Sequence, residues 1–483
     1  MRWLISVLLV VMTAALSTAQ PRVDGNRIVD EAGNPIAWRG VNFGSWLMLE
    51  TWISDLAPEW DMHARNLARE AGIEEQLEAA FGQVGPFDDD TQNWYRYIER
   101  LHAALQARTN PQNFAQFTQR LEEEPYIPDA RAFDRILRER FGDEGAQEIW
   151  DAYHDNWITE IEFRRTKALG FNLIRLPFWY WWFEKDETPY HYHEYGFRYL
   201  DRAIDWAQKY DLSIMLDLHG AVGGQNPWDH TGDLSRGELF EKPEYVKRSA
   251  ALWQEIARRY RDNDTVVAYS LLNEPFSAQD RADWLRVHDA LYEAIRAVDP
   301  NKIIVMEDGY KLEDEPYFSQ GFFLPPEQFG WENVVYSFHF YQTGSIDDHR
   351  ERAGLIARIA KREQERAGVP FFAGEFNTID DTPDALAGLA IYLKAFNRMG
   401  IHWTPWTFKF TRWHEPTLWG LYQYTDEWRR PNIHKDSKTA LLQTMKRLHG
   451  RHFGLHYQYA AVLRDALQQP FMPEQKQAAP AVD

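Results

Sequence analysis

Two glutamates in this sequence, Glu274 and Glu375, each follow a short apolar run. Glu274 stands in an Asn-Glu-Pro motif, and Glu375 stands in a Gly-Glu-Phe motif. Cleavage of a glycosidic bond requires one carboxylic acid that protonates the leaving oxygen and a second carboxylate that attacks or activates water. The two glutamates are therefore candidates for this pair. In a retaining enzyme their carboxyl groups would lie about 5–5.5 Å apart.

Other polar residues in similar positions could give the two carboxyl groups different protonation states. Arg175 could hold Glu375 ionised, whereas nearby negative charge and partial burial would keep Glu274 protonated. Asn273 is placed to bond a substrate hydroxyl next to the reacting carbon, and Tyr341 could donate a hydrogen bond to Glu375. This combination suits an acid role for Glu274 and a nucleophile role for Glu375.

The elements that must position these residues are eight short apolar runs separated by amphipathic stretches. The runs are Ala37–Phe43, Phe171–Leu176, Ser213–Leu218, Val266–Leu272, Lys302–Met306, Val334–Phe340, Pro370–Gly374 and His402–Trp406. The amphipathic stretches include Arg198–Tyr210, Tyr245–Tyr260, Asp283–Val298, Asp347–Ala367 and Ala385–Met399. Apolar strands that alternate with helices indicate buried parallel strands, and eight such units predict an α/β fold, a (β/α)8 TIM barrel. No Gly-x-Gly-x-x-Gly motif follows the first run, which weakens a dinucleotide-binding alternative.

The residues capable of chemistry gather at the carboxyl ends of six of these runs. In this architecture, catalytic groups emerge at that end of the barrel. One polar residue after an apolar run could be a solvated strand end. Six ends that carry Arg, His, Asn-Glu, His-x-Tyr, Glu and Trp instead predict one shared site at the mouth of the barrel.

The remaining segments give the expected domain organisation. Residues 1–19 have a basic start, an apolar run of fourteen and small residues near Ala19, which predicts a signal peptide and export to the periplasm or the exterior. The barrel domain would cover 20–454, beginning with a β-hairpin at Val23–Ile36. A helical insertion at about 58–140 would occupy the first βα loop, either at the catalytic rim or as an accessory lobe. Residues 455–483 would form a helix and a disordered tail.

Composition excludes several classes of protein. The 483 residues are 44% hydrophobic, which excludes intrinsic disorder. The chain has no cysteine, so it has neither disulfides nor thiolate metal ligands. Its formal charge of −20 argues against a nucleic-acid partner and is compatible with a neutral glucan. After signal cleavage no remaining stretch is apolar enough to span a membrane.

These motifs identify a family. The matching residues are Arg175 in Ile-Arg-Leu-Pro, His219 in Asp-Leu-His-Gly, Asn273 and Glu274 in Asn-Glu-Pro, His339 and Tyr341 in His-Phe-Tyr, Glu375 in Gly-Glu-Phe, and Trp406. The sequence resembles glycoside hydrolase family 5, a retaining family with catalytic glutamates on strands four and seven. The resemblance covers about Val23 to Phe453 apart from the insertion. It implies Glu274 as acid/base, Glu375 as nucleophile and the other matched residues as site residues.

Two further stretches resemble the exo-β-1,3-glucanase branch of that family. One is Arg39–Glu50, which reads Arg-Gly-Val-Asn-Phe-Gly-Ser-Trp-Leu-Met-Leu-Glu, and the other is His219–Asp229 after strand three. The resemblance implies that Glu50 and Asn226 line the innermost sugar site. Within these stretches Ser45 stands where the branch has glycine. The expected activity is exo hydrolysis of a β-1,3-glucan through a covalent glycosyl-enzyme.

The 21 tryptophans fit a sugar substrate, because the C–H faces of sugars lie on aromatic rings. Trp406 is the predicted floor of the cleavage subsite, and Trp228 and Trp182 are further candidates on rim loops. Tryptophans on the predicted helices, such as Trp150 and Trp253, are expected to pack in the core.

Several alternatives remain open at this point. A metal-dependent hydrolase could use His219, His339 and Asp217, but we expect Asp217 to point away from His219, and we predict no metal and no cofactor. A glucan-binding protein without activity could share the fold. A transglycosylase would use the same residues, and an endo-acting cellulase, a β-1,6-glucanase or a mannanase would belong to the same family.

Overall fold

The computed structural model describes residues 20–85, 94–234, 236–307, 323–411 and 417–471. Its centre is a sheet of eight parallel strands, each paired with its neighbour in chain order. The strands are β3 (Gly40–Asn42), β4 (Leu173–Trp179), β5 (Ser213–Gly220), β6 (Val266–Ser270), β7 (Ile303–Glu307), β8 (Val334–Gln342), β9 (Phe371–Thr378) and β10 (His402–Trp403). A parallel bridge between Arg39 and Trp403 joins the two edges, so the sheet closes into a barrel. The predicted (β/α)8 fold is confirmed.

The strands form where they were predicted because their residues are apolar on both faces. All seven residues of β4 and all eight of β9 are buried. Parallel strands are covered by side chains inside the barrel and by helices outside it, so a continuous apolar run is the expected sequence. Each of the eight predicted runs overlaps one observed strand.

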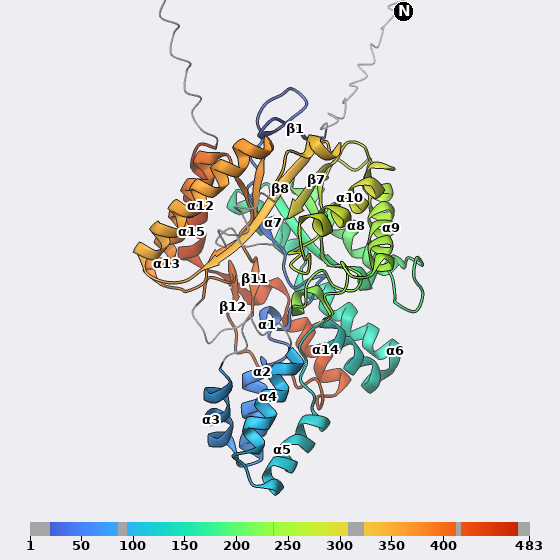
Figure 1. The fold of residues 1–483 in the computed structure, drawn as a ribbon, viewed down its shortest axis with the longest axis vertical. Coiled ribbons are helices and arrows are strands. Elements are labelled where there is room, and N and C mark those ends of the chain that lie inside the picture. The colour runs from blue at the N-terminus through green and yellow to red at the C-terminus, as the bar shows by residue number, and fades with distance from the viewer. Residues whose placement is uncertain (1–19, 86–93, 235, 308–322, 412–416, 472–483) are drawn as a thin grey trace, which may run out of the picture.

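Helices surround this sheet in the order expected of βα units (Figure 1). They are α7 (Glu160–Leu169), α8 (Glu194–Lys209), α9 (Pro243–Tyr260), α10 (Arg281–Arg296), α12 (Ile346–Ala367), α13 (Pro383–Met399) and α15 (Tyr457–Gln468). Local signals set their limits, as α13 illustrates. The Thr382 side chain caps its start, Pro383 occupies its first turn, and Gly400 ends it with a φ of 69°.

The N-terminal hairpin covers the end of the barrel opposite the catalytic mouth. It consists of β1 (Arg22–Asp24) and β2 (Arg27–Val29), which pair in antiparallel register. Ile28 and Trp38 pack there against the buried residues Leu173 and Phe372 of the barrel strands. The predicted hairpin is confirmed, and it shields the apolar end of the barrel opposite the mouth from water.

The predicted insertion at about 58–140 lies within the segment between β3 and β4, which is largely helical. The helices that precede α7 in this segment are α1 (Thr51–Ser54), α2 (Trp60–Glu70), α3 (Glu74–Val84), α4 (Trp94–Gln106), α5 (Pro111–Glu123) and α6 (Ala130–Trp157). Helices α2 to α5 share an apolar cluster of their own and lie beyond the barrel mouth, at the bottom of Figure 1. We call them the helical lobe. Helix α6 belongs to the barrel instead, because Trp150, Tyr153 and Trp157 join the main core.

A small sheet and one further helix complete the described part of the chain. The sheet contains β11 (Lys409–Phe410), β12 (Tyr422–Tyr424) and β13 (Phe453–Leu455), and α14 (Lys438–Arg447) packs against α6. Within the described ranges, no helix has both the length and the apolarity to cross a bilayer. The predicted signal peptide at 1–19, and residues 472–483 of the predicted tail, lie outside the described residues.

Candidate active site

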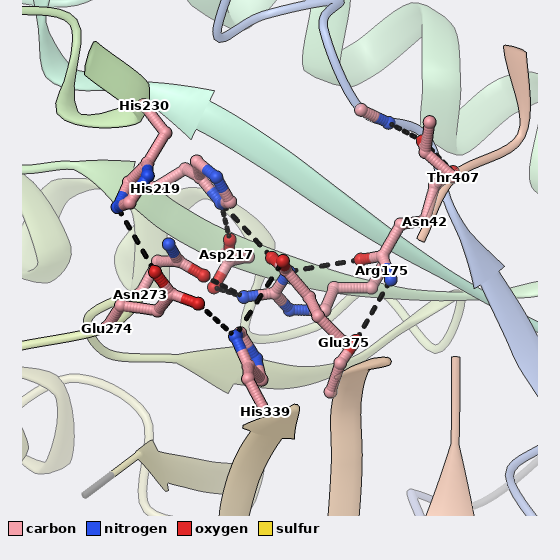
Figure 2. Close-up of polar contacts among 12 residues, drawn as sticks. Asn42, Arg175, Asp217, His219, His230, Asn273, Glu274, His339, Glu375 and Thr407 are labelled. Carbon is pink, nitrogen blue, oxygen red and sulfur yellow. Dashed lines mark hydrogen bonds and ion pairs between the residues drawn. The ribbon is translucent and has the colours of Figure 1, made fainter. Parts of the chain in front are cut away.

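Glu274 and Glu375 face each other at the mouth of the barrel (Figure 2). Glu375 lies in β9, and Glu274 follows β6 by four residues. One carboxyl oxygen of Glu274 lies within 4.8 Å of one of Glu375. Both side chains are largely buried, with exposed fractions of 11% and 5%. The structure therefore brings the two predicted carboxyl groups into one site.

Glu375 is held at both of its carboxyl oxygens. Arg175 Nη1 donates to Oε1 at 2.6 Å, and the Tyr341 hydroxyl donates to Oε2 at 2.6 Å. Burial alone would lower the pKa of Arg175, but Asp217, Glu375 and Glu307 more than offset it, so the pKa lies above its ordinary value. A permanent cation beside Glu375 stabilises the ionised carboxylate, which is the form that a nucleophile requires.

Arg175 also organises the neighbouring strands. Its Nη2 donates to Asn273 Oδ1 at 2.7 Å and lies 2.9 Å from Asp217 Oδ1. With its oxygen held in this way, Asn273 turns its amide nitrogen away from Arg175. Asp217 Oδ2 accepts from His219 Nδ1 at 2.8 Å. Our expectation that Asp217 points away from His219 is wrong, because residues two apart on a strand share one face.

Glu274 has an unusual backbone conformation. Its φ of 44° is in the left-handed region, which costs a residue other than glycine about 1–3 kcal/mol. Asn226 Nδ2 donates to the Glu274 carbonyl oxygen at 2.7 Å and helps to hold this conformation. The carboxyl group then reaches His339 Nδ1, 2.9 Å from Oε1, and His230 Nε2, 3.3 Å from Oε2.

Glu307, at the end of β7, is a site residue that sequence reasoning missed. Its Oε1 lies 3.0 Å from His339 Nδ1, and the side chain is 2% exposed. Burial, together with the charge of Glu274, raises the pKa of Glu307 well above its ordinary value. The available signal was its position directly after the fifth apolar run, but no motif surrounds it there.

The two glutamates open into a small pocket of about 170 Å3. Its wall consists of Glu50, Trp52, His219, Asp229, His230, Asn273, Glu274, Tyr341, Glu375, Trp406 and Trp419. This volume is below the ~300–1,000 Å3 of pockets for drug-sized ligands, so the pocket suits a single sugar ring. The Trp406 ring stacks on His219 with an interplanar angle of 8°, and Trp52 meets Trp419 edge to face. Trp406, the predicted floor of the cleavage subsite, lies in the wall of this pocket.

The glucanase-like stretches supply two acids to this pocket. Glu50 lines it as predicted and accepts from Trp52 Nε1 at 3.0 Å. Burial, with Asp229 and Glu375 nearby, raises the pKa of Glu50 well above its ordinary value. Asn226 was the wrong choice in its stretch, because it is fully buried and bonds Glu274 rather than lining the pocket. Asp229, three residues later, lines the pocket instead.

Two predicted rim tryptophans lie elsewhere. Trp182 is 2% exposed, its Nε1 donates to Leu47 O at 2.9 Å, and its ring packs edge to face on Trp150. It is a core residue. Trp228 is partly buried and does not contribute to the described pocket wall. Its backbone N–H bonds Asn226 Oδ1, so it fixes the loop after β5.

The spacing of Glu274, His339 and Glu375 would also permit a bound cation, since each offers one ligand atom within 4.8 Å of the others. However, Arg175 and Tyr341 already occupy both oxygens of Glu375. His339 Nδ1 likewise lies within hydrogen-bonding distance of Glu274. Because these groups satisfy one another, the arrangement is that of a hydrogen-bonded acid pair.

Comparison with known proteins agrees with this geometry. A family model described as cellulase (glycosyl hydrolase family 5) matches residues 143–411, more than half of the chain. The chain belongs to glycosyl hydrolase family 5. That family is the one that the motifs around Glu274 and Glu375 resemble, so the chain is a glycosidase.

Individual relatives carry several names. A beta-xylosidase of Phanerodontia chrysosporium is 24% identical over 80% of this chain and 70% of that protein. A sporulation-specific glucan 1,3-beta-glucosidase of Saccharomyces cerevisiae is 34% identical over 46% of this chain and 50% of that protein. This chain therefore spans about half the length of the yeast relative. Cel5A of Thermotoga maritima, solved with cellobiose, matches with a TM-score of 0.45 at 19% identity, over 60% of this chain and 90% of that one.

Proposed function

We propose that the protein is a retaining exo-glycosidase that removes single glucosyl residues from a β-1,3-glucan. The observation that carries the proposal is the carboxyl pair, whose oxygens approach within 4.8 Å in a pocket of about 170 Å3. Retaining enzymes keep their carboxyl groups about 5–5.5 Å apart, whereas inverting enzymes need about 6.5–9.5 Å to admit water.

The two steps follow from the contacts of each glutamate. In the first step Glu375 attacks the anomeric carbon, while Glu274 gives its proton to the glycosidic oxygen as the C–O bond breaks. A covalent glycosyl-enzyme results. In the second step Glu274, now ionised, takes a proton from water, and the hydroxide released by this transfer displaces Glu375. Asn273 turns its amide toward the sugar hydroxyl beside the reacting carbon.

The proposed specificity rests on shape and on relatives. A small pocket with Glu50 and Asp229 in its wall suits the non-reducing end of a chain better than its middle. Yeast relatives named glucan 1,3-beta-glucosidase share 30–34% identity with the chain. A β-xylosidase is the second candidate, because the relative of that name matches 80% of the chain and a pentose ring also fits the pocket volume.

Glu274→Ala tests the proposed catalytic roles. We expect it to lose activity on laminarin but to keep turnover of 2,4-dinitrophenyl β-glucoside, whose leaving group needs no proton, and azide should increase that rate. Glu375→Gln should be inactive on both substrates. Full activity of Glu274→Ala on laminarin would overturn the assignment. EDTA should leave the wild-type rate unchanged, and inhibition by EDTA would indicate a metal enzyme.

Product analysis separates the candidate substrates. Laminarin, pustulan, lichenan, carboxymethylcellulose, mannan and xylan should be incubated with the enzyme in parallel. Glucose as the sole product from laminarin supports exo-1,3 action, and oligosaccharide products at early times would indicate endo action or transglycosylation. Release of xylose from xylo-oligosaccharides at a higher rate would favour the second candidate.

We further propose that the protein is exported and that its signal peptide is removed near Ala19. The support is the basic and apolar start of the sequence. Expression of the full chain in a bacterial host, followed by N-terminal sequencing of the periplasmic protein, tests this proposal. Retention of Met1 in the cytoplasm would contradict it.

A further inference from the structure

Two residues of the pocket wall, Asp229 and His230, lie on a loop after β5 and not on a strand. They belong to residues 229–234, which we call the pocket loop and which begin with a short turn of 3-10 helix, Asp229–Thr231. Figure 2 shows His230 extending from this turn toward Glu274. Barrel strands are fixed by their neighbours in the sheet, whereas a loop needs contacts of its own to hold its side chains in place. The position of these two wall residues therefore depends on what the pocket loop bonds to.

The pocket loop bonds to the start of α6. Leu234 N donates to Asp129 Oδ2 at 2.7 Å, and Arg131 N donates to Gly232 O at 2.9 Å. The other oxygen of Asp129, Oδ1, accepts from Ala132 N at 2.7 Å and so caps the helix. Asp129 is only 5% exposed. One buried carboxyl group therefore joins the first turn of α6 to the loop that carries two pocket-wall residues.

The α6 side of this connection is itself fixed to the barrel. The guanidinium of Arg131 lies over the Trp181 ring, 3.8 Å from its centroid, and Arg131 Nη2 donates to the Tyr180 hydroxyl at 2.6 Å. Both aromatic residues follow β4 and are buried. Arg131 also pairs with Asp233 of the pocket loop at 3.4 Å. Because the start of α6 is anchored on the barrel in this way, it can support the loop.

We propose that Asp129 is a positioning residue that holds Asp229 and His230 in the wall of the sugar pocket and so sets the affinity of the pocket for its sugar. Asp129 acts through Leu234 and does not itself belong to the pocket wall, so it should affect binding more than bond cleavage. It falls within the predicted insertion at about 58–140 and gives that insertion a role at the catalytic rim. The inference rests on the proposed function, because it takes the pocket to be a sugar site.

Asp129→Ser isolates the contact between α6 and the pocket loop. Serine caps a helix about as well as aspartate, but its hydroxyl group is one bond shorter and cannot also reach Leu234 N. The variant therefore keeps the cap and loses the bond to the loop. Asp280→Ser is the matched control, because Asp280 caps α10 in the same way, accepting from Asp283 N at 2.8 Å, and is exposed.

Steady-state kinetics on an aryl β-glucoside measure the effect on binding. Burial raises the pKa of Asp129 to about 7, so the assays are run at about pH 8, where the carboxylate is the main form. We expect Asp129→Ser to raise KM about three- to tenfold, the size of one lost hydrogen bond, and to leave kcat within about twofold of wild type. Asp280→Ser should change neither quantity. Unchanged kinetics in the folded Asp129→Ser protein, or a fall in kcat with an unchanged KM, would overturn the inference.

Hydrogen exchange of the backbone provides a readout that does not need activity. A peptide covering residues 228–234 should exchange faster in Asp129→Ser, because Leu234 N loses its acceptor, and at the wild-type rate in Asp280→Ser. Asp129→Asn offers one acceptor oxygen to two donors, so it should show a smaller change in the same direction, and it replaces the serine variant if that protein does not fold.

Unchanged exchange in a folded Asp129 variant would refute the inference. Absence of activity on every glucoside in the wild-type protein would instead refute the proposed function, and the exchange rates would still decide whether Asp129 holds the pocket loop.

Discussion

Six carboxyl groups share the mouth of the barrel: Glu50, Asp217, Asp229, Glu274, Glu307 and Glu375. Arg175 contacts two of them directly, Asp217 and Glu375. Burial raises the pKa of Asp229 to about 6 and those of Glu50 and Glu307 well above their ordinary value. Protons that stay on Glu50, Asp229 and Glu307 limit the repulsion among the six acids, so the single guanidinium of Arg175 can pair with Asp217 and the predicted nucleophile Glu375.

The raised pKa of Glu307 predicts that the stability of the protein depends on pH. Folding raises its pKa above the ordinary value of 4.5, so the folded protein retains a proton that the unfolded chain releases as the pH rises. The stabilisation is therefore complete below about pH 4.5 and is lost as the pH rises toward the folded pKa. Glu307→Gln, which needs no such proton, should have a higher Tm than wild type at neutral pH.

Thermal unfolding between about pH 4 and pH 8 measures this difference. The gain in Tm should grow with pH in Glu307→Gln and should be absent in the exposed-site control Glu293→Gln. A Tm difference that is constant across this range would mean that Glu307 does not hold a proton through folding.

The contact between Tyr341 and Glu375 carries a second prediction. Burial and the charge of Glu375 raise the pKa of Tyr341 well above its ordinary value, so the hydroxyl keeps the proton that it donates. A hydrogen bond to a charged group contributes about 1.5–3 kcal/mol, which corresponds to about 10- to 150-fold in rate. Tyr341→Phe should lower kcat/KM by up to that factor, and it should also lower Tm, because it leaves a buried carboxylate oxygen without its donor. The exposed Tyr190→Phe should not change the rate, and an equal loss there would point to a general effect.

At the scale of elements, the turn after β3 positions Glu50. Ser45 has a φ of 57°, which explains why glycine is usual at this place in the related branch. The hydroxyl group of Ser45 stabilises the turn through hydrogen bonds. Ser45 Oγ donates to Glu50 O at 2.9 Å and accepts from Glu50 N at 3.1 Å. Ser45 thus has a strained backbone conformation, but its side chain forms two hydrogen bonds with the backbone of Glu50, which lines the pocket.

Substitutions at this position should separate the two effects. Ser45→Ala keeps the strain and loses both bonds, so we expect a loss of about 2 kcal/mol in unfolding free energy. Ser45→Gly also relieves about 1–2 kcal/mol of left-handed strain and should lie close to wild type in stability. Both variants should raise KM, because Glu50 is less firmly held. Denaturant unfolding and steady-state kinetics measure these quantities, and an alanine variant as stable as the glycine variant would contradict the strain argument.

Strand geometry explains how much of the site could be predicted from sequence. The eight apolar runs had to be buried strands, and side chains just after such strands had to meet at one end of a barrel. Arg175, Glu274, Tyr341 and Glu375 were found in this way. That these side chains meet across the barrel could be predicted without knowing the conformation of any loop.

Residues on loops could not be predicted in the same way, because long-range packing decides their direction. Trp182 turns into the core, where its Nε1 finds the Leu47 carbonyl group. Asn226 and Asp229 lie three residues apart, and the turn between them decides which one faces the pocket. No periodicity in the sequence encodes that choice.

At the scale of the whole molecule, the barrel core, the end of the barrel under the hairpin and the helical lobe form three separate apolar clusters among the described residues. The barrel and α6 share one cluster, and the helical lobe has another that includes Leu101 and Phe117. None of the described residues of the lobe contributes to the catalytic pocket. However, Glu59 at the start of α2 is close enough to act on the pKa of Asp229, so the lobe borders the site without lining it.

Because the barrel core and the lobe cluster are separate, a substitution in the lobe cluster should unfold the lobe without unfolding the barrel. Phe117 is 1% exposed, and Phe117→Ala should remove about 3–5 kcal/mol from the stability of the lobe. Because the barrel core does not include Phe117, we expect protease cleavage within residues 60–123 while hydrolysis of an aryl β-glucoside continues. Leu291→Ala in α10, a fully buried barrel residue, should instead lower activity and the main unfolding transition together. Loss of aryl-glucosidase activity in step with lobe cleavage would show that the lobe and the barrel unfold as one unit.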